Sequence, residues 1–425
     1  MNKVFMIAYQ YPPMGGPGVQ RTLKFTKYLK DFDWEPVVFT RDSAGFICDD
    51  TLIQDIPENM YIIRGKAYDF EDLTGILKKP GKFLSRKILI PDGAAVWKCM
   101  NRPAAFKYVS EQKPDIIYST SYPYSDHLLA LGLKKKYPKI PWVADFRDEW
   151  MNNPYLLDKP YNTLRMRIES KMERETISNA DAVIANTPVM MKNFIRSYGE
   201  FEYKFSCIPN GFDKDDFNEY KVSADKACNE KMTFTYTGML YGRRKPDLFL
   251  DCIRTLIDTG IIDKDKIKVK FIGKFTPGYF NGLCERFNLQ DIISVSDYLP
   301  HKESIKQLLM SDVLLLIEGA GPGGEAFYTG KLFEYMNAKK PIVAIIPEKG
   351  VAADLIKQSG TGYVADCDNR EQILHLLTNI YKLWYNNSLV YEPDYSVINK
   401  FERKNLTKQL VDIFNNCMEV LNENS

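Results

Sequence analysis

Two glycine-containing loops in the second half of the chain carry side chains that could bind a diphosphate. The first loop contains Gly238 and leads into three consecutive cations, Arg243, Arg244 and Lys245. Glycine permits a ligand to approach the backbone closely, and arginine or lysine can neutralise a diphosphate as it leaves. A solvated helix start would explain the cations alone, but the glycines before them favour phosphate binding.

The second loop, from Glu318 to Met336, is the segment richest in glycine. It enters a predicted helix whose opening N–H groups, around Thr329, Gly330 and Lys331, would meet an anion. Glu334, one turn further on, could accept two hydrogen bonds from ribose hydroxyls. A surface glutamate paired with Lys331 is the plain structural alternative, which the composition of the whole segment disfavours.

Charged residues crowd the end of one predicted strand in the first half of the chain. Asp145, Arg147 and Asp148 follow the apolar residues Val143 and Ala144. Ligands of parallel sheets sit at the carboxyl ends of strands, so this cluster is expected to face a ligand. Arg147 could instead have a purely structural role, in salt bridges with its own neighbours. So many charges at one strand end nevertheless favour a functional site.

A further glycine loop follows the first predicted strand. Gly15, Gly16 and Gly18 precede a predicted helix, and a helix N-terminus there would attract a phosphate or a sugar hydroxyl. A tight strand-to-helix turn explains these glycines equally well. The dinucleotide-binding fingerprint is broken, because Arg21 stands where a third glycine is required.

Short apolar runs alternate with amphipathic stretches along all 425 residues, which predicts parallel sheets covered by helices on both faces. The pattern restarts near residue 230, after a polar stretch at 213–231 that we interpret as a linker between two domains. A last amphipathic helix, about 404–421, needs another surface to cover. The predicted strands are 4–9, 35–40, 61–64, 115–120, 142–145, 182–186, 205–208, 233–236, 268–272, 313–317, 342–345 and 362–365.

The composition argues against several classes of protein. Lysine and arginine number 57 against 55 acidic residues, so the net charge of +2 creates no field that would attract nucleic acid. Eight cysteines without a C-x-x-C pattern, beside only three histidines, argue against a zinc cluster. D-x-D pairs such as Asp366 and Asp368 fall in polar loops and are attributed to chance. No cofactor and no essential metal are therefore expected.

We expect a cytoplasmic protein. No apolar run approaches the roughly 20 residues that span a bilayer, and the apolar run at 4–8 is too short for a signal peptide. The stretch 77–97 mixes basic and apolar residues, and could rest on anionic lipid at the inner face of the plasma membrane. A loop that packs its apolar side inward explains the same residues slightly better.

Several segments resemble family 4 of the retaining GT-B glycosyltransferases, over essentially the whole chain. They are Tyr11-Pro12-Pro13 with Gly15-Gly16, 180–187, 208–213, Tyr236-Thr237-Gly238 and 331–335. The resemblance implies an α/β fold of two Rossmann-like domains whose parallel sheets face each other across a cleft. It implies an acceptor-binding domain at 1–212, a nucleotide-sugar-binding domain at 213–399, and a final helix at 400–425 that crosses back onto the first domain.

The same resemblance implies roles for individual residues. Arg243 or Arg244 with Lys245 would hold the donor diphosphate, Gly273 would lie beside the base and His301 near the nucleotide. The family's first glutamate would stand at position 326, where this chain has Ala326. Either Glu325 reaches the donor sugar, or Glu318 and backbone N–H groups hold it.

These observations lead to a hypothesis: a sugar passes from a nucleotide diphosphate sugar to a hydroxyl of a polysaccharide, a lipid-linked acceptor or another glycoconjugate, with its anomeric configuration kept. Asp148 would orient the hydroxyl, and the leaving phosphate would take its proton. Residues expected in catalysis are Arg147, Asp148, Arg243, Lys245 and Glu325. Expected donor contacts are Gly16, Gly238, Arg243, Arg244, Lys245, Gly273, His301, Glu325, Thr329, Gly330, Lys331 and Glu334. Expected acceptor contacts are Gly15, Asp145, Arg147 and Asp148.

Three other functions stay open. A nicotinamide-dependent oxidoreductase is favoured by the first glycine loop and by Asp42 after the second strand, but Arg21 argues against it. A non-catalytic partner subunit that binds a sugar nucleotide would explain Ala326. An epimerase of GT-B fold, acting on the nucleotide sugar itself, is the nearest enzymatic rival.

Overall fold

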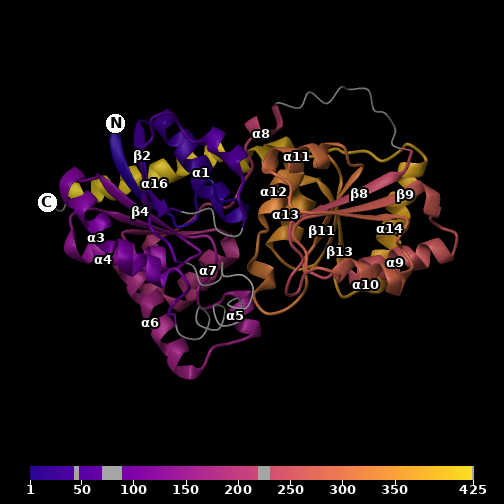
Figure 1. Cartoon of the computed structure of the whole chain (residues 1–425), viewed down its shortest axis with the longest axis horizontal. Helices are drawn as coiled ribbons and strands as arrows, with labels where there is room; N and C mark the ends of the chain where they lie inside the picture. Colours follow the sequence, from indigo (N-terminus) through magenta and orange to yellow (C-terminus); the bar gives the residue numbers. More distant parts are fainter. Residues whose placement is uncertain (43–46, 69–88, 219–229, 424–425) are drawn as a thin grey trace. The chain divides into compact units, whose positions relative to one another are not determined.

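The computed structural model describes the chain except for residues 43–46, 69–88, 219–229 and 424–425. It divides into two compact units. Unit 1 comprises Met1–Asn210 and Arg403–Ser425, and unit 2 comprises Gly211–Glu402. Each unit is built around one parallel sheet with helices on both faces (Figure 1).

Unit 1 contains a seven-stranded sheet of order β3-β2-β1-β4-β5-β6-β7, in which every neighbouring pair is parallel. The strands are β1 Asn2–Ile7, β2 Trp34–Arg41, β3 Ile62–Gly65, β4 Ile116–Ser121, β5 Trp142–Phe146, β6 Ala182–Ala185 and β7 Phe205–Cys207. The helices are α1 Pro17–Leu29, α3 Ala95–Gln112, α4 Ser125–Lys136, α5 Pro154–Asp158, α6 Thr163–Asn179, α7 Pro188–Ser197 and α16 Arg403–Glu423.

Side chains alternate between the two faces of β1, because successive residues of a strand point to opposite sides. Phe5 and Ile7 belong to one apolar core, whereas Val4 and Met6 belong to the other. Helix α16, drawn in yellow, packs beside α1 in unit 1 (Figure 1). Its side chains Leu406, Leu410 and Phe414 are wholly buried in the core that contains Val4 and Met6. The last helix therefore covers the first sheet, as expected.

Unit 2 contains a six-stranded parallel sheet of order β10-β9-β8-β11-β12-β13. The strands are β8 Met232–Thr237, β9 Ile267–Ile272, β10 Ile293–Ser296, β11 Val313–Ile317, β12 Ile342–Ile346 and β13 Gly362–Asp366. The helices are α8 Asp215–Asn218, α9 Asp247–Asp258, α10 Tyr279–Phe287, α11 His301–Leu309, α12 Gly330–Asn337, α13 Val351–Ser359, α14 Arg370–Tyr385 and α15 Tyr395–Ile398.

All twelve predicted strands are present, and the structure adds β10. This strand lies at the edge of its sheet, and its sequence Ile-Ser-Val-Ser is half exposed or exposed throughout. An edge strand with one wet side lacks the continuous apolar run of a buried parallel strand, which explains why the pattern misses it. Among the described helices, none has a stretch long and apolar enough to cross a bilayer.

Candidate functional site

The order of strands in unit 2 creates a ligand position at the ends of β8 and β11. From β8 the chain moves outward through β9 and β10, then returns to add β11 on the other side of β8. Such a reversal leaves a crevice at the carboxyl ends of the two strands where the order switches. Gly238 directly follows β8, and Glu318 directly follows β11. Both predicted donor loops therefore begin at this crevice.

Three glycines allow the loops of this region to approach one another. A Cβ at Gly273 would lie 2.4 Å from the Gly238 carbonyl oxygen, and a Cβ at Gly319 would lie 2.3 Å from that of Arg243. Both distances are shorter than atoms tolerate. Gly238 itself has a φ of 102°, a backbone conformation that favours glycine. The sequence prediction placed Gly238 and Gly273 in one site, and the structure brings their backbones into contact.

The three consecutive cations have different surroundings. Arg244 is buried, and its Nε donates to Glu318 Oε2 at 2.6 Å. Arg243 Nη1 donates to the Pro322 carbonyl at 3.1 Å, which fixes it along the glycine-rich loop. Lys245 is exposed. Since Arg244 is committed to a carboxylate, Arg243 and Lys245 are the cations better placed to meet an incoming diphosphate.

Helix α12 begins at the glycine-rich loop with Thr329 as its N-cap and Gly330 and Lys331 as its first residues. The Thr329 side chain makes no capping hydrogen bond, and the first N–H groups of a helix have no partner within it. Lys331 Nζ instead turns toward β8 and donates to the Tyr236 hydroxyl at 2.8 Å. Burial lowers the pKa of Lys331 to about 7, helped by the charge of Arg244 and opposed by Glu318 and Glu334.

Glu334 and His301, to which the family resemblance gave separate places near the nucleotide, lie together in unit 2. His301 Nε2 and Glu334 Oε1 are 3.0 Å apart, and His301 Nδ1 is 4.0 Å from Asp216 Oδ2. His301 begins α11 and Glu334 lies in the middle of α12, so two helices contribute. Glu325 is exposed in a short 3-10 turn, Gly324–Ala326. Within unit 2, close approaches join Gly238 with Gly273 and Lys331, and His301 with Glu334.

Asp145 in unit 1 is wholly buried and forms an ion pair with Arg21. Arg21 Nε and Nη2 donate to its two oxygens at 2.6 and 2.8 Å, and the Tyr118 hydroxyl also donates to it. Arg21 further donates to the Ile208 and Pro209 carbonyls, both at 2.9 Å. This arrangement joins α1, β5 and the end of β7. Sequence reasoning noted Arg21 only as the residue that breaks a glycine pattern.

Arg147 connects the first glycine loop to the end of β5. Its Nη1 donates to the Gly18 carbonyl at 2.6 Å, and its Nη2 to the Tyr122 carbonyl at 3.3 Å. Asp148 Oδ2 lies 3.7 Å from Arg147 Nε, and 25% of the Asp148 side chain is exposed. Gly18 has no room for a side chain, because a Cβ would meet Gln10 at 1.7 Å and Arg147 at 2.9 Å.

The other two loop glycines have looser surroundings. The Gly15 N–H donates to the Ile47 carbonyl at 3.0 Å. Gly16 caps α1 with a φ of 95°, and the space beside its Cα is open. Gly15, Gly16, Arg147 and Asp148 thus surround the carboxyl ends of β1 and β5.

Sequence reasoning missed a buried carboxyl group at the same sheet edge of unit 1. Asp126 is wholly buried in the first turn of α4, and one oxygen accepts the Tyr9 N–H at 2.8 Å. Burial raises the pKa of Asp126 well above its usual range, despite the opposing charge of Arg147. Asp126 stands in a polar stretch ahead of an amphipathic helix, where an ordinary N-terminal helix acid looks the same in sequence.

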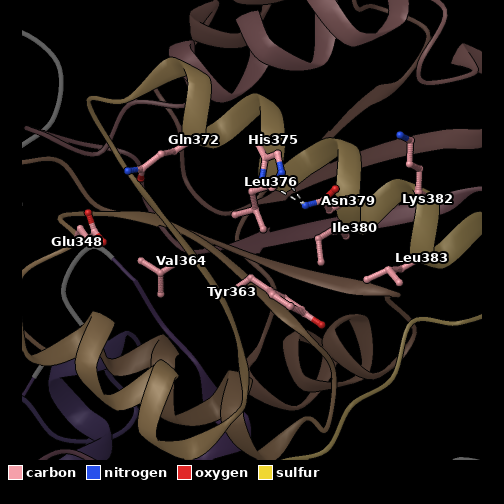
Figure 2. Close-up of a pocket in the computed structure, with 10 residues that line it drawn as sticks. All are labelled: Glu348, Tyr363, Val364, Gln372, His375, Leu376, Asn379, Ile380, Lys382 and Leu383. Carbon is pink, nitrogen blue, oxygen red and sulfur yellow. Dashed lines mark hydrogen bonds between the residues drawn. The ribbon is translucent and has the colours of Figure 1, made fainter.

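Two other features of unit 2 stand apart from these residues. A hollow of about 600 Å³ lies between the edge strand β13 and α14, lined by residues such as Tyr363, His375 and Lys382 (Figure 2). Asp366, Cys367 and Asp368 come within 4.8 Å of one another, but both Asp366 oxygens already accept backbone N–H groups, at 3.0 and 3.1 Å. Neither feature involves a predicted site residue.

Comparisons with known proteins agree with the fold. Residues 18–216 match the model of Glycosyltransferase Family 4. A glycosyltransferase from Rickettsia africae superposes with a TM-score of 0.65 at 14% identity, covering 98% of each chain. Sucrose-phosphate synthase from Thermosynechococcus elongatus reaches a TM-score of 0.69 at 12% identity, covering 99% of this chain and 100% of the other.

A third structure belongs to a different enzyme class. The UDP-GlcNAc 2-epimerase of Methanocaldococcus jannaschii, solved with UDP-GlcNAc and UDP, gives a TM-score of 0.54 at 12% identity and covers 97% of this chain and 99% of its own. Among curated proteins, none matches the sequence. The structures establish the GT-B fold, and the family match covers most of unit 1. The sequence match therefore shows a Glycosyltransferase Family 4 domain over residues 18–216 of the chain.

Proposed function

We propose that unit 2 binds the nucleotide diphosphate sugar around the ends of β8 and β11. The observation that carries this proposal is the convergence of Gly238, the cations that follow it and the start of α12 at one crevice of the sheet. Helix N-termini and basic side chains both favour phosphate oxygens. Glu334, beside His301, would accept hydrogen bonds from the ribose hydroxyls, and Gly273 would lie beside the base.

Transfer in this proposal relies on stabilising the leaving diphosphate. Arg243, Lys245 and the N–H groups of Gly330 and Lys331 would interact more strongly with the phosphate as negative charge builds up on it. The glycosidic bond to the diphosphate then breaks without a protein nucleophile. The acceptor hydroxyl attacks the face from which the phosphate leaves, so the anomeric configuration is retained. The departing phosphate oxygen takes the hydroxyl proton. No metal ion is needed for this neutralisation.

We assign the acceptor to unit 1. Arg147 and Asp148 would orient its hydroxyl, with Gly15 and Gly16 in the adjoining loop. Asp145 is left out of direct acceptor contact, because its two oxygens are buried and bonded to Arg21. The proposed acceptor is a cell-surface polysaccharide, a glycolipid or another glycoconjugate. The protein would act in the cytoplasm, at the inner face of the plasma membrane. Residues 77–88 of the stretch 77–97 lie outside the described residues.

Glu325 would contact the donor sugar from the exposed turn before α12. It stands one residue before Ala326, the position of the family's first glutamate. A Cβ at Gly350 would lie 3.1 Å from the Glu325 Cα, so the start of α13 supports this turn closely. Changing Glu325 to glutamine should alter the selectivity among donor sugars more than the affinity for the nucleoside diphosphate alone.

A thermal-shift panel of nucleoside diphosphates and their sugars tests the donor site. Ligand binding to the native state raises the unfolding temperature by mass action. We expect one nucleotide to give a clear increase, and the matching sugar nucleotide to give one at least as large. Turnover is then followed as release of nucleoside diphosphate with candidate glycan acceptors, and NMR of the product should show a retained anomeric configuration. The absence of any nucleotide-dependent shift would contradict the donor site.

An epimerase is the second candidate, because the fold is shared with the UDP-GlcNAc 2-epimerase. An epimerase would change the sugar of the donor in the absence of any acceptor. It would form no glycoside product and would release no matching amount of nucleoside diphosphate. Incubation of the bound sugar nucleotide alone, followed by NMR, separates the two reactions. We expect the sugar to stay unchanged until an acceptor is added.

A further inference from the structure

The candidate donor site contains a half-buried amine, that of Lys331, to which the proposed transfer assigns no chemistry. The Lys331 Nζ donates to the Tyr236 hydroxyl at 2.8 Å and lies 4.2 Å from the centre of the Tyr236 ring. An ammonium group in water is surrounded by solvent and keeps its charge near neutral pH. Here one phenol group, belonging to a residue that is itself buried, takes the place of much of that solvent. The charged form of Lys331 is therefore poorly solvated.

Titratable groups from each neighbouring element act on this amine. Arg244, in the loop after β8, repels a second positive charge, whereas Glu318 after β11 and Glu334 on α12 attract it. Neither glutamate is dedicated to Lys331. Glu318 Oε2 is 2.6 Å from Arg244 Nε, and Glu334 Oε1 is 3.0 Å from His301 Nε2. Burial is the largest cause of the shift, and it brings the pKa of Lys331 to about 7.

Gly238 leaves a direct approach to the same amine. A Cβ at Gly238 would lie 3.2 Å from Lys331 Cε and 3.4 Å from Nζ. Any side chain at this position would therefore cover the amine. An anion resting on the Gly238 backbone and on the first turn of α12 would stand close to Lys331. Its negative charge would favour the ammonium form over the neutral amine.

A second acceptor is available to the charged form. Glu318 Oε1 is buried and has no hydrogen-bond partner among the described residues. A buried oxygen without a partner is costly, so a donor that becomes available nearby is favoured. The charge of Glu318 already acts on Lys331, so the ammonium form is the donor that this carboxylate favours.

We propose that Lys331 takes up one proton from solvent when the diphosphate of the donor binds, and releases it when the nucleotide leaves. The inference rests on the proposed donor site. The step converts the neutral amine and one proton into an ammonium ion, and no bond of the sugar nucleotide forms or breaks. Lys331 is thus a binding residue whose charge follows occupancy of the site.

The coupling between nucleotide binding and protonation of Lys331 has a measurable size. At pH 8 an amine with a pKa near 7 is about nine-tenths neutral, so binding should take up close to one proton. The affinity should then weaken by up to about tenfold for each pH unit above 7. The nucleotide's own phosphate does not interfere at pH 8, because its second pKa is about 6.

Isothermal titration calorimetry at pH 8 tests the proposal with whichever of UDP, GDP and ADP binds the full chain. Titrations in Tris and in HEPES, which differ in ionisation enthalpy, give the number of protons exchanged. We expect uptake of about 0.9 proton by the wild type. Lys331→Arg, which is charged at every accessible pH, should bind the nucleotide with uptake near zero. Lys331→Met should also show no uptake, and should lose the pH dependence of its affinity.

Lys245→Met is the matched control, since it removes a cation of the same site. It should bind more weakly yet take up the proton as the wild type does. Thermal unfolding establishes that each variant is folded, and Lys331→Arg carries the test if Lys331→Met is not. Nucleotide binding by the wild type without proton uptake would overturn the proposal and leave the donor site intact, as would undiminished uptake in both Lys331 variants. Failure of all three nucleotides to bind would instead contradict the donor site itself.

Discussion

Replacing Asp145 with asparagine tests whether this carboxylate, at the end of β5, has a structural role and not a chemical one. Asp145 is 0% exposed and Arg21 is 1% exposed, and two short hydrogen bonds of 2.6 and 2.8 Å join them. The amide preserves the shape of the side chain but removes its charge. The Arg21 guanidinium would then be buried without a counter-charge, which costs about 3–5 kcal/mol in comparable pairs. We expect the free energy of unfolding of unit 1 to fall by about this amount.

Urea unfolding followed by tryptophan fluorescence measures this loss. Four of the five tryptophans lie in unit 1, at positions 34, 97, 142 and 150, so the signal reports mainly on that unit. With a urea slope of about 3 kcal/mol per molar, the midpoint should decrease by roughly 1–1.7 M.

The matched control is Asp148→Asn. Its side chain is 25% exposed and lies 3.7 Å from Arg147, a weak and solvated pair, so its stability should change by less than about 1 kcal/mol while turnover falls. The assignment of Asp145 to structure would be refuted if Asp145→Asn unfolded within about 1 kcal/mol of the wild type yet lost its activity.

Four further predictions concern turnover, metal dependence, the pH dependence of stability and membrane contact. Lys245→Ala should reduce turnover by at least tenfold while leaving the unfolding temperature within a degree or two, because Lys245 is exposed; EDTA should leave turnover unchanged, and loss of activity with chelator would show that a metal neutralises the diphosphate. Burial raises the pKa of Glu173 from 4.5 to about 7, so its contribution to stability is complete below pH 4.5 and is lost as pH rises through 7; Glu173→Gln should flatten that part of the stability curve, and an unaltered curve would contradict it. The purified protein should float with anionic liposomes and not with neutral ones if the 77–97 stretch rests on lipid; equal behaviour with both would exclude this contact.

Much of the fold follows from local chemistry. Buried parallel strands such as β11 and β12 are continuous apolar runs, because both of their faces are covered by helices. The last helix shows its apolar face through Leu406 and Leu410 at helical spacing. Glycines and charges directly after strands predict a ligand site at one edge of each sheet, since the carboxyl ends of parallel strands meet at one edge. The apolar pattern did not predict β10, because this edge strand has one exposed side and no continuous apolar run.

The pairing and the charge state of site residues depended on the tertiary structure. Asp145 looks like its neighbours Arg147 and Asp148 in sequence, but folding places it against Arg21, 124 residues away, and removes both from water. Lys331 belongs to a predicted phosphate-binding helix start, yet burial lowers its pKa to about 7, with opposing contributions from Arg244 and Glu318 of other elements. Sequence determines which groups can ionise and which elements carry them. Solvation and distance decide whether they do, and both exist only once the distant segments have packed together.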